Sequence, residues 1–192
     1  QGHRVVGPVY ARLPGELPEF LADLAAGPQP LVYFAMGSSG NRDLVLDVLA
    51  GLGRADCQVL APVRSHLRQE DLETLPRNVH VTDWLPAHQL GDAVDLAITH
   101  GGEGTVQTSC VQGWPFIGIP LQFEQRFNVQ RCVAFGSAKL VSQNEARRTD
   151  LAALVRQALA DDGMRSRARR MARLMEGLDG PGRAAEAICE LL

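Results

Sequence analysis

Residues 98–108 have the sequence Ile-Thr-His-Gly-Gly-Glu-Gly-Thr-Val-Gln-Thr, and the rest of the chain is built around this segment. The apolar run at 96–98 predicts a buried strand, and residues 105–111 predict a helix. A helix that begins directly after a glycine turn presents free N–H groups and the positive end of its dipole, which favour an anion. Glycines also let a phosphate approach the backbone closely.

We therefore expect a diphosphate at this turn, with His100 and Thr105 at its rim as further hydrogen-bonding groups. The same pattern has a simpler interpretation. Strand–glycine–helix turns also occur in α/β proteins that bind nothing there, and a single histidine is often structural. The neighbouring segments decide between the two.

Short apolar runs alternate with helical segments along most of the chain. Strands are expected at 31–35, 59–61, 79–81, 96–98, 116–119 and 139–141. Helices are expected at 41–52, 87–90, 105–111, 124–135, 149–160, 163–177 and 181–191, with a loop or weak helix at 67–75. The alternation predicts an α/β fold, a Rossmann-like doubly wound parallel sheet with C-terminal helices.

Residues that bear polar or aromatic chemistry follow four of these strands: Ser38, Trp84, His100 and Glu124. In such sheets, ligands bind at the carboxyl ends of the strands, so these residues are expected at one edge. Residues 1–30 contain five prolines and a short amphipathic piece at 17–25, which predicts a linker and a short helix. The domain is expected to span 31–192, and a linker at the start suggests that an upstream part has been removed.

The composition is typical of a globular chain of 192 residues, with 45% hydrophobic residues and a net charge of −3. This charge gives no reason to expect nucleic-acid binding, and the arginine cluster at 165–173 is interpreted as a solvated helix face. Four scattered cysteines fit no zinc pattern and indicate reduced thiols in a cytoplasmic protein. No apolar run is long enough to predict a membrane span, no signal peptide is recognised, and no metal-ligand spacing is found.

Four short blocks then carry a resemblance. They are Trp84-x-Pro86, His100-Gly101-Gly102-Glu103-Gly104-Thr105, Gly113-Trp114-Pro115 and Glu124-Gln125-x-x-Asn128. In this order they resemble the donor-binding signature of family 1 (UDP-glycosyltransferase-like) enzymes with the GT-B fold. Val6-Gly7-Pro8 is similar to that family's inter-domain linker, and residues 34–38 are similar to the first strand of its C-terminal domain. The chain is therefore expected to be the C-terminal half of a GT-B enzyme.

The resemblance implies which residues bind the nucleotide. Trp84 would stack on the base and Leu85 would begin the segment whose main chain meets the base edge. The diphosphate would be bound by five residues: Ser38, His100, Gly102, Gly104 and Thr105. The alternatives are that Trp84 plugs the end of the sheet and that Ser38 is a capping or turn serine.

The resemblance also assigns three further residues to the parts of the donor that carry the sugar and the ribose. Glu124 and Gln125 would bind sugar hydroxyls, although Glu124 also suits the N-terminus of a helix as an acid. The family's common pattern has a ribose-binding glutamate three residues after the Ser/Thr of the turn, where this chain has Thr108. Branches of the family that use dTDP-sugars often lack that glutamate, so the resemblance favours a dTDP-sugar as donor. The alternative is that Thr108 only caps or packs, and that other residues bind the ribose of a UDP-sugar.

The implied reaction is metal-independent glycosyl transfer with inversion, with the nucleoside diphosphate sugar as substrate and no cofactor. The family's general base is a histidine of the N-terminal domain, so no catalytic residue is assigned; the histidines at 3, 66, 80 and 88 match no base position. The expected partner is an N-terminal acceptor domain, in cis or as a separate subunit. A non-catalytic nucleotide-sugar binding module and half of a GT-B epimerase are the other possibilities.

Three other protein classes have glycine-rich motifs that resemble parts of this sequence, but the chain lacks the segments that define those classes. No G-x-S-x-G segment accompanies the His-Gly-Gly sequence, which argues against an α/β-hydrolase. No G-x-x-x-x-G-K-[ST] segment is present, and no G-x-G-x-x-G follows the first strand, which argues against a P-loop NTPase and a dehydrogenase.

Overall fold

The computed structural model describes residues 3–9, 12, 14–148 and 150–190. The predicted linker positions 1–2, 10–11 and 13, and the predicted helix limits at 149 and 191, lie outside the described residues. No helix among the residues described is long and apolar enough to cross a membrane.

Six parallel strands form one sheet with the order β3-β2-β1-β4-β5-β6. The strands are β1 (Leu31–Ala35), β2 (Gln58–Ala61), β3 (Val79–Val81), β4 (Leu96–Thr99), β5 (Phe116–Gly118) and β6 (Ala138–Leu140). Helices cover both faces, so the strands are apolar on both sides, which is why they appear in the sequence as continuous apolar runs. The prediction of a doubly wound parallel sheet is confirmed.

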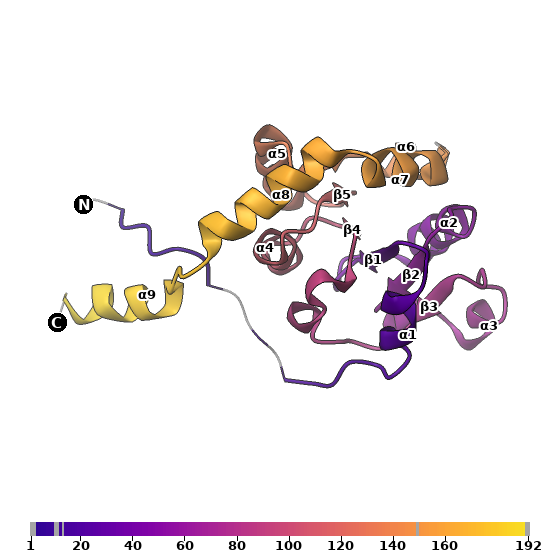
Figure 1. The fold of residues 1–192 in the computed structure, drawn as a ribbon, viewed down its shortest axis with the longest axis horizontal. Helices are drawn as coiled ribbons and strands as arrows, with labels where there is room; N and C mark the ends of the chain where they lie inside the picture. Colours follow the sequence, from indigo (N-terminus) through magenta and orange to yellow (C-terminus); the bar gives the residue numbers. More distant parts are fainter. Residues whose placement is uncertain (1–2, 10–11, 13, 149, 191–192) are drawn as a thin grey trace.

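The helices connect these strands and extend the chain beyond the last one (Figure 1). They are α1 (Leu21–Ala26), α2 (Arg42–Leu52), α3 (Gln69–Leu72), α4 (Glu103–Gln112), α5 (Phe123–Phe135), α6 (Gln143–Arg148), α7 (Leu151–Leu159), α8 (Asp162–Met175) and α9 (Gly180–Cys189). Short 3-10 turns lie at Arg64–His66, Ala87–Gln89 and Gly91–Ala93. Sequence analysis missed α6, which has two turns at most and no long apolar period to reveal it.

Alternating residues of β1 divide the core into two layers. Val32 and Phe34 pack with α2 and α7 on one face of the sheet, and both side chains are fully buried. Leu31 and Tyr33 belong to the other layer, together with residues of α1, α4 and α5. This division follows from the strand period of two, because successive side chains point to opposite faces.

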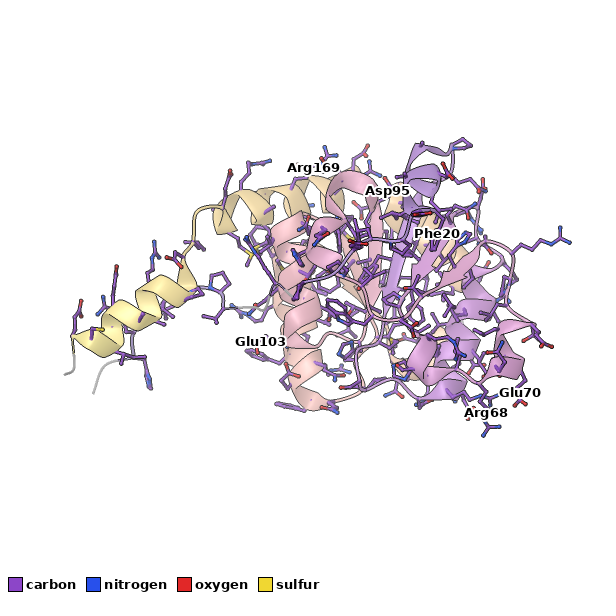
Figure 2. All side chains as sticks on the ribbon, turned by 90° about the horizontal axis from the view of Figure 1, so that it is seen from below. Phe20, Arg68, Glu70, Asp95, Glu103 and Arg169 are labelled. Atoms are coloured by element: carbon purple, nitrogen blue, oxygen red, sulfur yellow. The ribbon has the colours of Figure 1, made fainter. Side chains whose placement is uncertain are left out.

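All strands run in the same direction, so their carboxyl ends share one edge of the sheet. In Figure 2, Asp95, which precedes β4, lies in the upper part of the view, and Glu103, which follows β4, lies in the lower part. Arg68 and Glu70, which follow β2, also lie in the lower part of this view, to the right of Glu103. The chain changes direction across the sheet between β1 and β4, and such a switch point leaves a crevice at the carboxyl edge.

The two ends of the chain extend together away from the sheet (Figure 1). Arg4 forms an ion pair with Glu190 near the end of α9, and Gly180 packs directly against the backbone of Pro8. Exposed apolar side chains occur in both segments, among them Val5, Leu178 and Ile188. The linker and α9 therefore form one projecting unit beside the domain.

Candidate functional site

A chain of hydroxyl groups fixes the turn between β4 and α4. The Gly101 N–H donates to Thr99 Oγ1 at 3.3 Å, and the Thr99 hydroxyl donates to Thr105 Oγ1 at 2.7 Å. The Thr105 hydroxyl then donates to the Gly102 carbonyl at 2.9 Å. Gly101 itself has φ +85°, a left-handed conformation that favours glycine. The Thr105 side chain is thus part of the turn, and its backbone N–H is what it offers to a ligand.

The N-terminus of α4 has no side-chain cap. Its N-cap residue is Gly102, and the first turn of a helix has no internal acceptors for its N–H groups. At Gly104 a Cβ atom would meet nothing within 4 Å, so the space beside this turn is open. Glu103, the acidic residue of this turn, is exposed and accepts a hydrogen bond from Gln107 Nε2 at 3.0 Å. The turn therefore presents several backbone donors to one open space, which suits an anion.

His100 lies between the turn after β4 and the turn after β1. Its side chain is buried, and Cβ atoms built at Gly37 and Gly102 would lie 2.9 and 2.3 Å from its Nε2 atom. Burial lowers the pKa of His100, so the ring is neutral at pH 7 in the free protein. Its buried Nδ1 atom forms no well-aligned hydrogen bond among the described residues, although the nearby Ala35 backbone opposes the effect of burial on the pKa. The ring thus sits at the switch point, held by packing against two glycines.

A second histidine holds the loop after β1. His66 Nε2 donates to the Gly37 carbonyl at 2.7 Å, and Gly37 has φ +52°. Ser39 Oγ, in the same loop, accepts a hydrogen bond from Gln125 Nε2 at 3.1 Å. Ser38 lies between these anchored residues and is exposed. The loop that carries the predicted phosphate-binding serine is therefore bonded to the 3-10 turn after β2 and to α5.

One pocket collects most of the residues predicted to bind the nucleotide. It has a volume of about 280 Å³ and is lined by residues that include Trp84, Leu85, Gly104, Thr105, Thr108 and Tyr33. Trp84 is 58% exposed, and Gly15 of the linker lies against its ring. The Thr108 hydroxyl donates to the Gly104 carbonyl at 2.8 Å. Gly37 also lines the pocket and packs against the His100 ring, whereas His100, Gly102 and Ser38 are not among the residues that line it.

The two residues predicted to bind the sugar, Glu124 and Gln125, both lie on α5, but they differ in burial and in their hydrogen-bond partners. Glu124 is exposed and accepts a hydrogen bond from Asn128, whose amide also donates to the Gly101 carbonyl at 3.2 Å. Gln125 is only 3% exposed, and its Oε1 accepts from the backbone N–H groups of Leu121 and Gln122 at 2.9 and 3.2 Å. Its amide thus caps the start of α5 and holds the β1–α2 loop, a structural role that sequence analysis did not assign.

Three residues of the site were missed by sequence analysis. Thr99 ends the central strand, and a threonine two residues before a glycine N–H is a recognisable side-chain turn motif. His66 follows β2 and therefore lies at the same edge as the other site residues. Tyr33 shares its strand face with Leu31 and Ala35, so the period of two would have placed it toward the pocket.

Acidic and metal-binding side chains are sparse around the pocket. Within residues 3–9, 12, 14–148 and 150–190, no three His, Cys, Asp or Glu side chains gather closely enough to hold a metal ion. The N-terminus of α4 offers partial positive charge to an anion, and the neutral ring of His100 offers a hydrogen-bonding group beside it.

Comparison with known proteins gives a consistent family assignment. The profile described as "Erythromycin biosynthesis protein CIII-like, C-terminal domain" matches residues 46–191. The "PGL/p-HBAD biosynthesis glycosyltransferase" of Mycobacterium tuberculosis (strain ATCC 25177 / H37Ra) is 30% identical over 172 residues, which are 88% of this chain and 39% of that protein. The chain thus spans less than half the length of this relative.

Solved structures share the fold at lower sequence identity. The calicheamicin glycosyltransferase CalG4 has a TM-score of 0.78 and 24% identity, covering 95% of this chain and 45% of that one. The spinosyn rhamnosyltransferase SpnG, solved in complex with thymidine diphosphate, has a TM-score of 0.79 and 20% identity, covering 96% of this chain and 51% of that one. In each case the similarity covers about half of the longer chain.

Proposed function

The chain belongs to the family of EryCIII-like C-terminal domains of GT-B glycosyltransferases, and from this we propose that it binds the nucleotide-sugar donor of an inverting, metal-independent glycosyltransferase. One observation carries the proposal: the uncapped N-terminus of α4 and the exposed ring of Trp84 border the same pocket. A helix N-terminus suits a diphosphate and a tryptophan face suits a base. A nucleoside diphosphate contains both groups in one molecule.

The proposed mechanism gives the phosphate site a role in the reaction. An acceptor hydroxyl attacks the anomeric carbon of the sugar, the bond from that carbon to the diphosphate oxygen breaks, and the nucleoside diphosphate leaves. Negative charge grows on the departing phosphate, where the α4 N–H groups, His100 and Ser38 stabilise it. The acceptor's proton passes to a base outside this chain. Glu124, exposed at the start of α5, is proposed to bind the sugar.

The remaining half of the active site is proposed to come from an acceptor domain. The chain spans 39% of its mycobacterial relative, so most of such a protein lies elsewhere. Residues 1–30 then act as the inter-domain linker and 31–192 as the donor domain. The projecting unit of linker and α9 exposes Val5, Leu178 and Ile188, which an acceptor domain would cover.

Replacing Trp84 with alanine tests the base site directly. We expect Trp84→Ala to weaken dTDP binding about tenfold, because stacking of a base on an aromatic ring contributes about 1–3 kcal/mol. Binding of inorganic pyrophosphate should stay the same, since pyrophosphate has no base. Calorimetric titration measures both. Phe127→Ala is the matched control, because Phe127 is 56% exposed and lies on α5. Equal dTDP affinity in Trp84→Ala and wild type would refute the base site.

The nucleotide preference is proposed to depend on Thr108. Thr108 lines the pocket, and a neutral hydroxyl already bonded to Gly104 offers no carboxylate to a ribose diol. SpnG, a relative in fold, was solved with thymidine diphosphate, whose deoxyribose lacks the 2′-hydroxyl. We therefore propose dTDP-sugars as donors.

A glutamate at this position should shift the preference toward UDP. We expect Thr108→Glu to raise UDP affinity relative to dTDP affinity by about fivefold, because a carboxylate accepts hydrogen bonds from both ribose hydroxyls. The ratio of the two dissociation constants, measured by titration, is the readout. Thr108→Gln has a similar length without the charge and serves as the control. An unchanged ratio in Thr108→Glu would show that this position does not face the ribose.

A further inference from the structure

Tyr33 combines deep burial with a place in the wall of the nucleotide pocket. It is the third residue of β1, and its side chain is only 7% exposed. Its ring packs at a tilt against Trp114, with the ring centroids 5.6 Å apart. Trp114 is itself fixed, because its Nε1 donates to the Gly91 carbonyl at 2.8 Å. Packing against the fixed ring of Trp114 therefore holds the phenol ring of Tyr33 in one orientation.

No hydrogen bond of the Tyr33 hydroxyl is found among the described residues, although tyrosine hydroxyls that are buried usually have a partner. Side-chain atoms that are sealed from solvent and unpartnered occur in Thr82, His100 and Gln107, and the Tyr33 oxygen is not among them. The oxygen therefore keeps a small contact with solvent, and Tyr33 lines the pocket. Burial raises the pKa of Tyr33, so the group stays a neutral phenol that can both donate and accept.

We propose that the Tyr33 hydroxyl hydrogen-bonds to the nucleoside part of the donor, a contact that rests on the proposed function of the pocket. Tyr33 shares the pocket wall with Trp84 and Leu85, the residues assigned to the base. It lies four residues before Gly37, where the phosphate loop begins, and strand residues advance by about 3.3 Å each. Tyr33 thus lies deeper along β1 than the loop that begins at Gly37. A rigid, unpartnered polar group there selects a ligand with a polar atom facing it.

Tyr33→Phe removes this hydroxyl and keeps the ring that packs on Trp114. We expect the dissociation constant for dTDP to rise about fivefold, the effect of one neutral hydrogen bond. The dissociation constant for pyrophosphate should not change. Thr82→Val is the matched control: it also removes an unpartnered hydroxyl, but one sealed from solvent and outside the pocket lining, so dTDP affinity should be that of wild type.

The outcomes separate this inference from the function it rests on. If wild type binds dTDP and Tyr33→Phe binds it equally well, the contact does not exist and the inference is overturned. If Tyr33→Phe weakens pyrophosphate binding as much as dTDP binding, the hydroxyl does not act on the nucleoside, which also overturns it. If wild type binds pyrophosphate and dTDP equally, the proposed function itself fails. Thermal unfolding of each variant confirms that all are folded during the titrations.

Discussion

Gly101→Ala is expected to destabilise the domain by about 3 kcal/mol, the largest effect on folding that the site predicts. Gly101 has φ +85°, a conformation that costs a residue with a Cβ about 1–2 kcal/mol. The added Cβ would also lie 2.8 Å from the Gln125 carbonyl oxygen and 2.6 Å from Val129 Cγ2. Overpacking of this kind costs about 1–3 kcal/mol, because α5 must move to relieve it.

Urea unfolding measures this difference as a lower midpoint at an unchanged slope. Gly104→Ala is the matched control in the same segment, since its Cβ would meet nothing within 4 Å and its backbone is helical. That change should leave stability equal or raise it by about 0.5–1 kcal/mol, the usual gain of alanine over glycine in a helix. Similar midpoints for the two variants would mean that the turn after β4 is not built as described.

His100→Ala is expected to weaken nucleoside diphosphate binding about 10- to 100-fold. A hydrogen bond to a charged group contributes about 1.5–3 kcal/mol, and the His100 ring lies between the two turns that we propose bind the phosphates, against Gly37 and Gly102. Because His100 is assigned to the phosphates, dTDP and pyrophosphate should lose affinity by the same factor. This differs from Trp84→Ala, which should affect dTDP alone.

His80→Ala is the control for loss of a histidine as such. His80 is half-buried on β3 and contacts Gln58 at 2.9 Å, outside the lining of the pocket. Burial lowers the pKa of His80, as it does for His100, so the two histidines are electrostatically similar. Calorimetric titration at pH 7 should give wild-type affinity for His80→Ala. Wild-type pyrophosphate affinity in His100→Ala would remove His100 from the phosphate site.

Much of the fold could be predicted because the strands are buried on both faces. Runs such as Leu31–Ala35 and residues 96–98 consist mainly of apolar residues, and helices between such strands favour a parallel sheet. Trp84 follows β3, and Thr105 and Thr108 lie on α4, which follows β4. Because both strands end at the same edge of the sheet, these three residues could be expected to line one pocket, as they do. What the sequence did not reveal is α6, whose six residues show no apolar period.

The site was harder to predict where site residues form hydrogen bonds with one another. Gln125 occurs in a motif that suggests a sugar contact, yet its amide caps α5 and binds Ser39. The hydroxyl chain from Thr99 to Thr105 depends on the left-handed turn at Gly101, which brings residues six apart into contact. His66 reaches Gly37 from the 3-10 turn after β2, and β2 lies beside β1 because of the sheet order. Such contacts arise from tertiary geometry and leave no local pattern.

Titration of the 192-residue chain with dTDP, UDP and pyrophosphate under one set of conditions tests the central claim most directly. The pocket predicts saturable binding of one molecule per chain, with dTDP tightest, UDP weaker and pyrophosphate weakest, because Trp84 acts only on a base and Thr108 offers no carboxylate to a ribose diol. Equal affinity for pyrophosphate and dTDP, or no saturable binding of dTDP, would contradict the claim that this domain holds a nucleoside diphosphate donor.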